Sequence, residues 1–187
     1  MKTVRIPPDQ PVQEPVTLEE AKAHLRIDYD AEDALITSYI AVAREHCEVV
    51  TGLALAPATW EARLDAFPAG AIELPYPPLV EVESVRYVDA GGDEVQLDAG
   101  AYKVDTLIMP GTMAPVDRWP DGRDVRIRYR AGYEGGEIPH AARQAILLLV
   151  GHWHANREAV ITGTSVTEVP LAVDRLLWGI RLYEVAR

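Results

Sequence analysis

The segment from residue 151 to 160, GHWHANREAV, contains the side chains that most resemble a chemical site, because His152, His154 and Glu158 are residue types that bind zinc. Two histidines on one helical face share an ion when they are three or four residues apart, as in H-E-x-x-H. His152 and His154 are two apart, which on a helix directs them about 200° apart. His154 and Glu158 have i, i+4 spacing, but two ligands alone make a poor zinc site. The segment is therefore predicted to end a helix with Trp153 in the core, and a metal-dependent enzyme is the least favoured alternative.

Other motifs with catalytic or ligand-binding potential are incomplete. The acidic segment 28–33, DYDAED, lacks the glycine and the glutamate of a calcium-binding loop, and helix capping explains the same acids. The glycines of residues 131–136 have no following lysine and no G-x-G-x-x-G pattern, so they predict a turn. No G-x-S-x-G nucleophile motif is present, and Cys47 lies on the apolar stripe of a helix. We therefore predict no catalytic residue, no metal ligand and no cofactor, in a protein that is not an enzyme.

Two helices are predicted before residue 57. Thr17 and Glu20 have the spacing of a capping box that begins a short helix. Asp30 is predicted as the N-cap of a long second helix, which ends at Gly52. Apolar residues in this second helix recur at three and four positions, so one stripe faces a core. The stripe consists of Leu35, Ile36, Tyr39, Ile40, Ala43, Cys47 and Val50.

Between residues 57 and 132 the pattern changes to that of β-strands. Short runs alternate apolar and polar residues and are separated by breaks rich in proline and glycine. They predict a small antiparallel sheet or partly closed barrel. One run, DVRIRYRAGY, places Arg126, Arg128 and Arg130 on one face of a strand. A solvated face or salt bridges between subunits are favoured for this row over contact with phosphate.

Helical periodicity returns after Pro139, which is predicted at the first helical position. Ala142, Ala145, Ile146 and Leu149 belong to the expected buried stripe, and a short helix opened by Pro170 closes the chain. The predicted fold class is α+β: a mainly α-helical bundle core of about four helices with an inserted small antiparallel β-domain. Its parts are an extended N-terminal arm (1–15), the helical core with a C-terminal docking segment (16–56 and 133–187), and the β-domain (57–132).

The composition is that of a globular chain with an acidic surface. The 187 residues are 48% hydrophobic, and the formal net charge is −11, which argues against a sequence-independent nucleic-acid binder, because such proteins replace counterions on phosphate with Lys and Arg. Residues 1–56 and 57–132 each carry a net charge of −5, whereas residues 133–187 carry −1. We therefore expect a protein partner to bind the nearly neutral, apolar last third.

The cysteine count and the apolar runs bear on location. The single Cys47 excludes an intramolecular disulfide, so the fold needs no oxidising compartment. The first fifteen residues lack the apolar segment of a signal peptide, and the longest apolar run, AILLLVG, is too short to span a bilayer. A cytoplasmic protein with no membrane partner is the expectation.

The linear order of these segments is more specific than any one of them. TLEEAKAHLRIDYDAEDALITSYIAVAREHCEVVTGLAL resembles the N-terminal half of phage head–tail connector proteins, which are also called adaptor or head-completion proteins. That family typically has K-x-x-L-R at the end of a short helix, then D-x-x-D, then a long helix closing on T-G. The corresponding residues here are Lys22, Leu25, Arg26, Asp30, Asp33, Thr51 and Gly52.

The resemblance continues to about residue 183. ELPYPPLVEVESVRYVD, VRIRYRAGY with the helix that follows it, and VPLAVDRLLWGIR resemble successive segments of family members that carry a β-insertion. Ile180 stands where an aromatic residue is common in the family. Similar proteins occur in tailed phages, prophages and phage-derived gene transfer agents.

The resemblance implies a structural protein of the virion neck, assembled in the host cytoplasm. Such proteins form a ring, commonly twelvefold, under the portal, where they extend the DNA channel and join head to tail. The implied partners are the portal protein, a neck or tail-completion protein and other copies of the chain, while DNA passes through without sequence-specific binding. The alternative is a phage-encoded regulatory or binding module that acts through the β-insertion.

The resemblance also implies which residues bind these partners. In the family the C-terminal segment docks onto the portal, and we expect part of this docking set to be exposed in the lone subunit. The set comprises Leu171, Val173, Leu176, Leu177, Trp178, Arg181 and Tyr183. Arg126, Arg128, Arg130 and Arg157 are expected to form subunit contacts or a structural tie.

Overall fold

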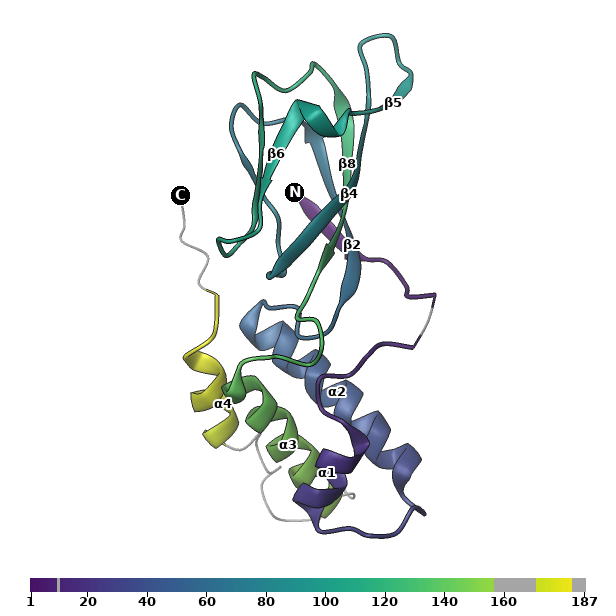
Figure 1. The fold of residues 1–187 in the computed structure, drawn as a ribbon, viewed down its shortest axis with the longest axis vertical. Coiled ribbons are helices and arrows are strands. Elements are labelled where there is room, and N and C mark those ends of the chain that lie inside the picture. Colours follow the sequence, from purple (N-terminus) through teal and green to yellow (C-terminus); the bar gives the residue numbers. More distant parts are fainter. Residues whose placement is uncertain (10, 157–170, 183–187) are drawn as a thin grey trace, which may run out of the picture. The chain divides into compact units, whose positions relative to one another are not determined.

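The computed structural model describes residues 1–9, 11–156 and 171–182 (Figure 1), and these residues divide into two compact units. The β unit comprises residues 1–12 and 57–133, and the helical unit comprises residues 13–56 and the described residues from 134 onward. Four α-helices and two antiparallel sheets lie within the described ranges. The predicted α+β fold class, a helical core with an antiparallel β insertion, is confirmed.

The helical unit contains α1 (Leu18–Leu25), α2 (Asp33–Thr51), α3 (His140–Ala155) and α4 (Leu171–Trp178). The predicted capping box begins α1: the Thr17 hydroxyl accepts from the Glu20 amide at 3.1 Å, and the Glu20 carboxylate accepts from the Thr17 amide at 2.9 Å. Gly52 ends α2 in the left-handed region, with φ of 74°, as predicted. None of the helices in the described ranges is long and apolar enough to cross a membrane.

Two predictions about helix starts are wrong. Asp30 does not cap α2, because its carboxylate accepts from the Lys22 ammonium at 2.6 Å. The N-cap is Glu32, whose side chain makes no capping bond. Pro139 lies at the N-cap of α3 rather than at the first helical position, since its ψ of 133° is extended. In the first case an ionic partner eight residues away competes successfully with a local backbone amide.

The core of the helical unit lies between α2 and α3, which pack side by side (Figure 1). The buried members of the α2 stripe are Ile36, Ile40, Ala43 and Cys47. The buried members of the α3 stripe are Ala142, Ala145, Ile146, Leu149 and Val150. Trp153, predicted in the core, is only half-buried and lies with its ring 6.1 Å from that of Tyr39.

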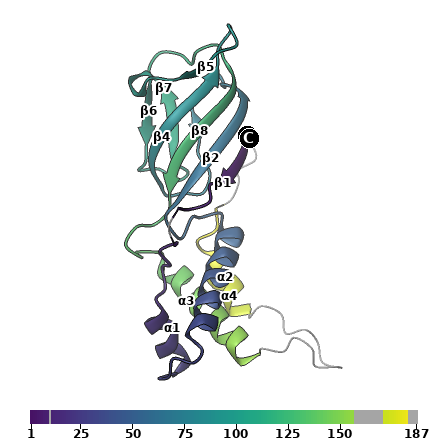
Figure 2. The ribbon, with the colours of Figure 1, turned by 90° about the vertical axis from the view of Figure 1, so that its right-hand side faces the viewer.

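The β unit consists of two antiparallel sheets (Figure 2). The five-stranded sheet has the order β1-β2-β8-β4-β5, and the three-stranded sheet has the order β3-β7-β6. The strands of the first are β1 (Lys2–Arg5), β2 (Ala58–Ala66), β8 (Arg123–Ala131), β4 (Leu79–Val88) and β5 (Glu94–Gln96). Those of the second are β3 (Ile72–Glu73), β7 (Thr112–Pro115) and β6 (Tyr102–Asp105).

The predicted N-terminal arm is a strand over part of its length. Residues 2–5 form β1, which pairs with β2 in antiparallel register from Lys2 opposite Arg63 to Arg5 opposite Trp60. Within the predicted extended arm (1–15), these four residues are therefore an edge strand of the β unit. Sequence periodicity misses this strand because it is short and its partner lies more than fifty residues away.

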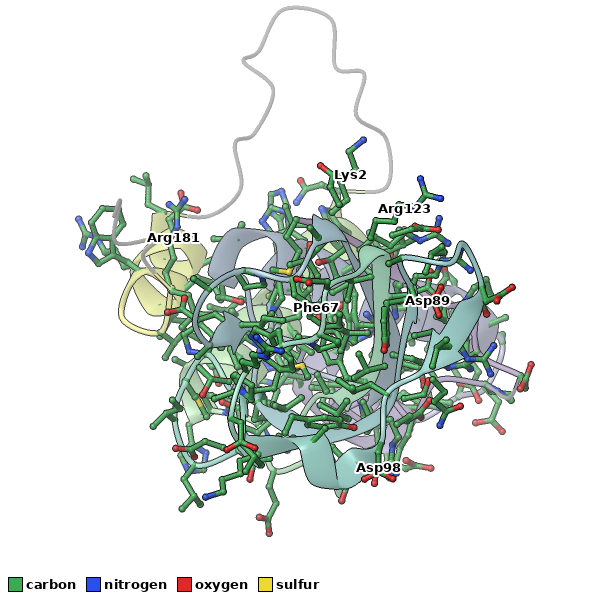
Figure 3. All side chains as sticks on the ribbon, turned by 90° about the horizontal axis from the view of Figure 1, so that it is seen from above. Lys2, Phe67, Asp89, Asp98, Arg123 and Arg181 are labelled. Carbon is green, nitrogen blue, oxygen red and sulfur yellow. The ribbon has the colours of Figure 1, made fainter. Side chains whose placement is uncertain are left out.

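Aromatic side chains and tight glycines fix the interior of the β unit. Phe67, at the centre of the view in Figure 3, stacks on Trp119 with ring centroids 5.1 Å apart and meets the edge of Tyr87 at 5.4 Å. The Trp119 indole donates to the Gly70 carbonyl at 2.7 Å. Gly111, just before β7, lies against Leu79 of β4 so closely that an added Cβ would be 2.5 Å from the leucine Cβ.

This contact predicts that Gly111→Ala destabilises the β unit by about 1–3 kcal/mol, because the added methyl group overpacks a buried leucine. Urea unfolding followed by tryptophan fluorescence measures the change. The matched control is Gly70→Ala, since nothing lies within 4 Å of a Cβ at Gly70. Equal unfolding midpoints for the two variants would contradict the prediction.

Candidate partner-binding surfaces

The C-terminal helix α4 carries apolar side chains on two faces. Val173 and Leu177 are completely buried in the helical unit, where α4 packs on α3 and α2. Leu171 and Trp178 are 70% and 64% exposed, and their i, i+7 spacing places them on one outward face. The expectation that part of the docking set is exposed is confirmed for these two residues.

The remaining members of the docking set differ in their exposure. Leu176 is half-buried and Arg181 is exposed, while Tyr183 lies outside the described residues. Val173 and Leu177 hold α4 against its own core, so the exposed members of the docking set are Leu171, Trp178 and Arg181. Beyond α4 the chain is tied to the end of α2, because the Leu182 amide donates to the Thr51 carbonyl at 2.8 Å.

The arginine row of β8 lies on the outer face of the five-stranded sheet, as the alternation predicts. Val125, Ile127 and Tyr129 are buried, and Arg126, Arg128 and Arg130 lie on the opposite face. All three are paired with carboxylates of the same unit: Arg126 with Asp124 at 2.6 Å and Glu94 at 3.2 Å, Arg128 with Glu83 at 3.0 Å, and Arg130 with Glu81 at 2.8 Å.

These pairs compensate the charge of the arginine row. The hydrogen bond from Arg126 holds the pKa of Asp124 below its usual range. The row is therefore a self-neutralised surface rather than a free cationic strip for phosphate. Arg157, the fourth residue expected in a subunit contact or tie, lies outside the described residues.

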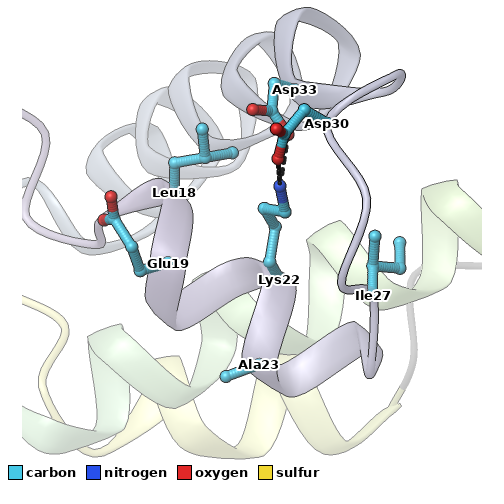
Figure 4. Close-up of a pocket in the computed structure, with 7 residues that line it drawn as sticks. All are labelled: Leu18, Glu19, Lys22, Ala23, Ile27, Asp30 and Asp33. Atoms are coloured by element: carbon cyan, nitrogen blue, oxygen red, sulfur yellow. Dashed lines mark hydrogen bonds and ion pairs between the residues drawn. The ribbon is translucent and has the colours of Figure 1, made fainter.

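Lys22 of the K-x-x-L-R motif and both aspartates of the D-x-x-D motif, Asp30 and Asp33, line a pocket of about 410 Å³ beside α1 (Figure 4). The Lys22 ammonium points between two carboxylates, 2.6 Å from Asp30 and 2.8 Å from Asp33. These hydrogen bonds raise the pKa of Lys22, and the bond from Lys22 lowers the pKa of Asp30. The lysine compensates the charge of the two carboxylates, and the three side chains form a lysine clamp that closes the α1–α2 connection.

A buried ion-pair network lies on α2. Arg44, which is almost completely buried, donates to Glu14 at 2.8 Å and to Glu48 at 2.7 Å. The second oxygen of the Glu48 carboxylate accepts from the amides of Leu55 and Ala56 at 2.9 and 3.3 Å. Arg44 and Glu48 therefore hold the chain both before α1 and after α2.

The histidines of α3 belong to the helical packing. Nε2 of His154 lies 2.8 Å from Oε2 of Glu32, and both side chains are largely buried. Within residues 1–9, 11–156 and 171–182, no group of three or more His, Cys, Asp or Glu side chains is placed to hold a metal ion. Glu158 is outside these residues. Burial raises the pKa of the Cys47 thiol to about 12, which leaves it protonated near neutral pH.

Sequence reasoning missed two features. Arg44 interrupts the apolar stripe of α2 between Ile40 and Cys47, and a charge at such a position signals a buried ion pair. The loop between β6 and β7 carries the run Leu107, Ile108 and Met109, and all three side chains are exposed. Three consecutive apolar residues in a loop are the available signal for this second feature.

Comparison with known proteins relates part of the chain to one family. Residues 15–85 match the model of the family described as phage gp6-like head-tail connector protein. This range contains α1, α2, β2, β3 and most of β4, so the resemblance predicted from the sequence is confirmed in this part of the chain. No curated protein sequence matches the chain significantly.

Solved structures resemble the whole chain. A protein in the virion of a native gene transfer agent (GTA) particle is 25% identical, with a TM-score of 0.77 over 100% of this chain and 98% of that chain. A protein in the neck of an empty GTA particle, computed with C6 symmetry, is 24% identical with a TM-score of 0.79 at the same coverage. One in the neck of a native GTA particle, computed with C12 symmetry, is 23% identical with a TM-score of 0.72, again at the same coverage. The α+β fold is that of a GTA neck protein.

The buried network predicts that Arg44→Leu lowers the free energy of unfolding by about 3–5 kcal/mol, because Glu14 and Glu48 are then left without their cation. Arg63→Leu is the control, because the Arg63 side chain, which pairs with Glu61, is 58% exposed and the loss of a pair with an exposed cation costs less than about 1 kcal/mol. Thermal and urea unfolding measure both. Similar losses for the two variants would show that burial of Arg44 does not matter.

The lysine clamp predicts that the stability of the helical unit depends on pH. Because the folded-state pKa of Asp30 is lowered from 3.8, the pair stabilises the fold above the unfolded pKa and loses this effect as pH falls through the folded pKa. Lys22→Met should raise the Asp30 pKa and flatten the loss of stability below about pH 4. Titration of the carboxyl carbon by NMR measures this, with Lys103→Met in the β unit as the control. An Asp30 pKa that is unchanged in Lys22→Met would refute the clamp.

Proposed function

We propose that the chain is a structural head–tail adaptor, located at the neck of a tailed phage or gene-transfer-agent particle, where it joins head to tail and extends the DNA channel. The observation that carries this proposal is the likeness over the whole chain to a protein of a GTA virion, at 25% identity and a TM-score of 0.77. The connector-family match of residues 15–85 supports the same role. Two of the similar structures are of a particle neck, which supports a role without catalysis. Nothing in the comparisons points to a regulator or a metal-dependent enzyme.

The subunit is proposed to act as part of a ring. Similar chains lie in necks computed with C6 and C12 symmetry, which supports a ring of twelve copies here. Neighbours in such a ring meet head to tail, so each subunit presents two different side surfaces. The nine acidic and three basic residues of positions 13–56 support a channel wall that repels DNA phosphate and lets DNA pass without sequence-specific binding.

The outward face of α4 is proposed as the portal-docking surface. Its exposed Leu171 and Trp178 lie on one face, and tryptophan is a preferred anchor of protein interfaces. Arg181, exposed just beyond the helix, adds a cation at the edge of this surface. The buried Val173 and Leu177 keep the helix in register on the core, so the surface is supported from beneath. The next neck or tail-completion protein is the proposed partner on the opposite side of the ring.

Purified chain should co-sediment with heads that carry the portal, and mass spectrometry should find it in stoichiometric amounts in intact particles. Trp178→Ser and Leu171→Ser should each weaken binding to portal-bearing heads at least about tenfold, as loss of an interface anchor does. Val4→Ser, which removes an exposed apolar side chain from β1, is the control and should bind normally. Absence of the chain from intact particles would overturn the adaptor role. Normal binding of both α4 variants to portal-bearing heads would overturn the proposed docking surface.

A further inference from the structure

The five-stranded sheet of the β unit has two open edges, β1 at one end and β5 at the other. In an antiparallel pair, directly opposed residues alternate between those that exchange backbone hydrogen bonds and those that do not. The Ile6 amide donates to the Thr59 carbonyl opposite it at 2.9 Å, so the even-numbered residues of β1 are the ones bonded to β2. The amide and the carbonyl of Thr3 therefore point away from β2, toward the open edge.

The outer edge of β5 is open in the same way. The Leu97 amide donates to the Val85 carbonyl at 2.8 Å, and the alternation makes Val95, two positions earlier, the residue of β5 that is bonded to β4. The amides and carbonyls of Glu94 and Gln96 thus face outward. An unpaired strand edge is a template for pairing with another chain.

The two edges carry opposite charge. Residues 1–6 contain Lys2 and Arg5 and no acid, whereas residues 89–98 contain four acids and no base. These acids are Asp89, Asp93, Glu94 and Asp98. Within the described residues, neither Lys2 nor any of the three aspartates takes part in an ion pair. Lys2 and Asp98 project from opposite sides of the β unit (Figure 3).

Charge selects β5 among the edges that β1 could pair with. The other two edges are β3 and β6 of the three-stranded sheet. β6 contains one base, Lys103, and one acid, Asp105, and β3 is only two residues long. Two copies of β1, or two copies of β5, would bring like charges together, which destabilises a strand pair. The pairing in which charges of opposite sign meet is β1 with β5.

The direction of the strands suits a ring. Neighbouring strands of the sheet are antiparallel throughout. Because β1 and β5 are the first and the fifth of five strands, they run in the same direction. A rotation about an axis along the strands therefore brings β5 of one copy beside β1 of the next in parallel orientation. The same rotation can be repeated from copy to copy, as a head-to-tail ring requires.

The faces of the two edge strands also match. Thr3 lies opposite the buried Ala62, and Val95 lies opposite Tyr87, whose ring packs on Phe67. Thr3 and Val95 thus both face the interior of the β unit. Since directly opposed residues share a face, these two residues can lie opposite each other in one continuous sheet.

We infer that β1 of one copy adds in parallel to β5 of the next copy, with Thr3 opposite Val95, so that the sheet continues from subunit to subunit. This inference rests on the proposed ring. In this register the Thr3 amide donates to the Glu94 carbonyl, and the Gln96 amide donates to the Thr3 carbonyl. Lys2 then lies beside Glu94 on the outer face. A shift by one residue would place Lys2 beside the inward-facing Val95 and lose this match.

Disulfide cross-linking between copies tests the register. Val4→Cys and Gln96→Cys, which the register places opposite each other on the outer face, are made as single variants and as a double variant of the full chain. They are bound to portal-bearing heads and oxidised with copper phenanthroline. The buried native Cys47, with its thiol pKa of about 12, stays unreactive. We expect a dimer from the mixed single variants, none from either alone, and a ladder of oligomers from the double variant.

The control pair for the cross-link is Val4→Cys with Lys103→Cys. Lys103 is exposed on β6, the edge of the other sheet. This pair should form no cross-link, because β6 is not the strand that receives β1.

Thr3→Pro tests the backbone bond without disturbing β1 within its own subunit. Proline is tolerated on an edge strand where its missing N–H would face away from the sheet. Thr3→Pro should keep the melting temperature of the control Thr3→Ala. It should reduce occupancy of the heads at least about fivefold, because the Glu94 carbonyl of the neighbouring copy loses its donor. Val4→Ser changes neither the outward-facing amide nor the charges of the edge and should bind normally.

Three results would overturn the inference while leaving the adaptor role intact. The first is stoichiometric binding of the cysteine variants to heads without any Val4–Gln96 cross-link, and the second is a cross-link of Val4→Cys with itself. The third is equal occupancy of the heads by Thr3→Pro and Thr3→Ala. Failure of the unmodified chain to bind portal-bearing heads would instead overturn the adaptor role and this inference together.

Discussion

The arrangement of the helical unit depends on one buried cation. Arg44 lies on α2 with 2% of its surface exposed, and it is held by Glu14 from the segment before α1 and by Glu48 one turn along the helix. A guanidinium without water is tolerated only when its charge is compensated and its donors are bonded. Glu14 and Glu48 are therefore both required at these positions to compensate the charge of Arg44. Because Glu48 also accepts from the amides of Leu55 and Ala56, the same pair fixes the chain where it leaves α2.

The helices built around this pair are apolar on more than one face. In α2 the stripe through Ile36 and Cys47 is buried, while Val42 and Val49 are exposed. The same pattern recurs in α4, where Leu177 is buried and its neighbour Trp178 is exposed. The exposed apolar side chains of α2 and α4 lie outside the packed core of the helical unit, and those of α4 form the portal-docking surface that we propose.

Local sequence patterns predict the helices and strands well, but they do not predict contacts between residues that are distant in the sequence. The capping box of Thr17, the stop at Gly52 and the outward row of Arg126, Arg128 and Arg130 follow from neighbours within a few positions. The capping role predicted for Asp30 is wrong because its partner Lys22 belongs to another helix. Two contacts join residues that are far apart in the sequence: the pairing of β1 with β2, and the hydrogen bond of Arg44 to Glu14, thirty residues away. Local sequence periodicity carries no information about such contacts.

The two segments that most resembled metal sites have a common structural explanation. Within DYDAED, Asp30 and Asp33 bind the Lys22 ammonium. The negative charge of these two carboxylates is therefore compensated by a lysine of the same chain. Glu32 of the same segment lies 2.8 Å from His154 of GHWHANREAV. The acids and the histidine thus join the α1–α2 connection to the last turn of α3. Residue types that bind metals also form strong hydrogen bonds and ion pairs with other side chains. Here the acids and the histidine are not spaced to bind an ion, and their contacts join α1, α2 and α3 instead.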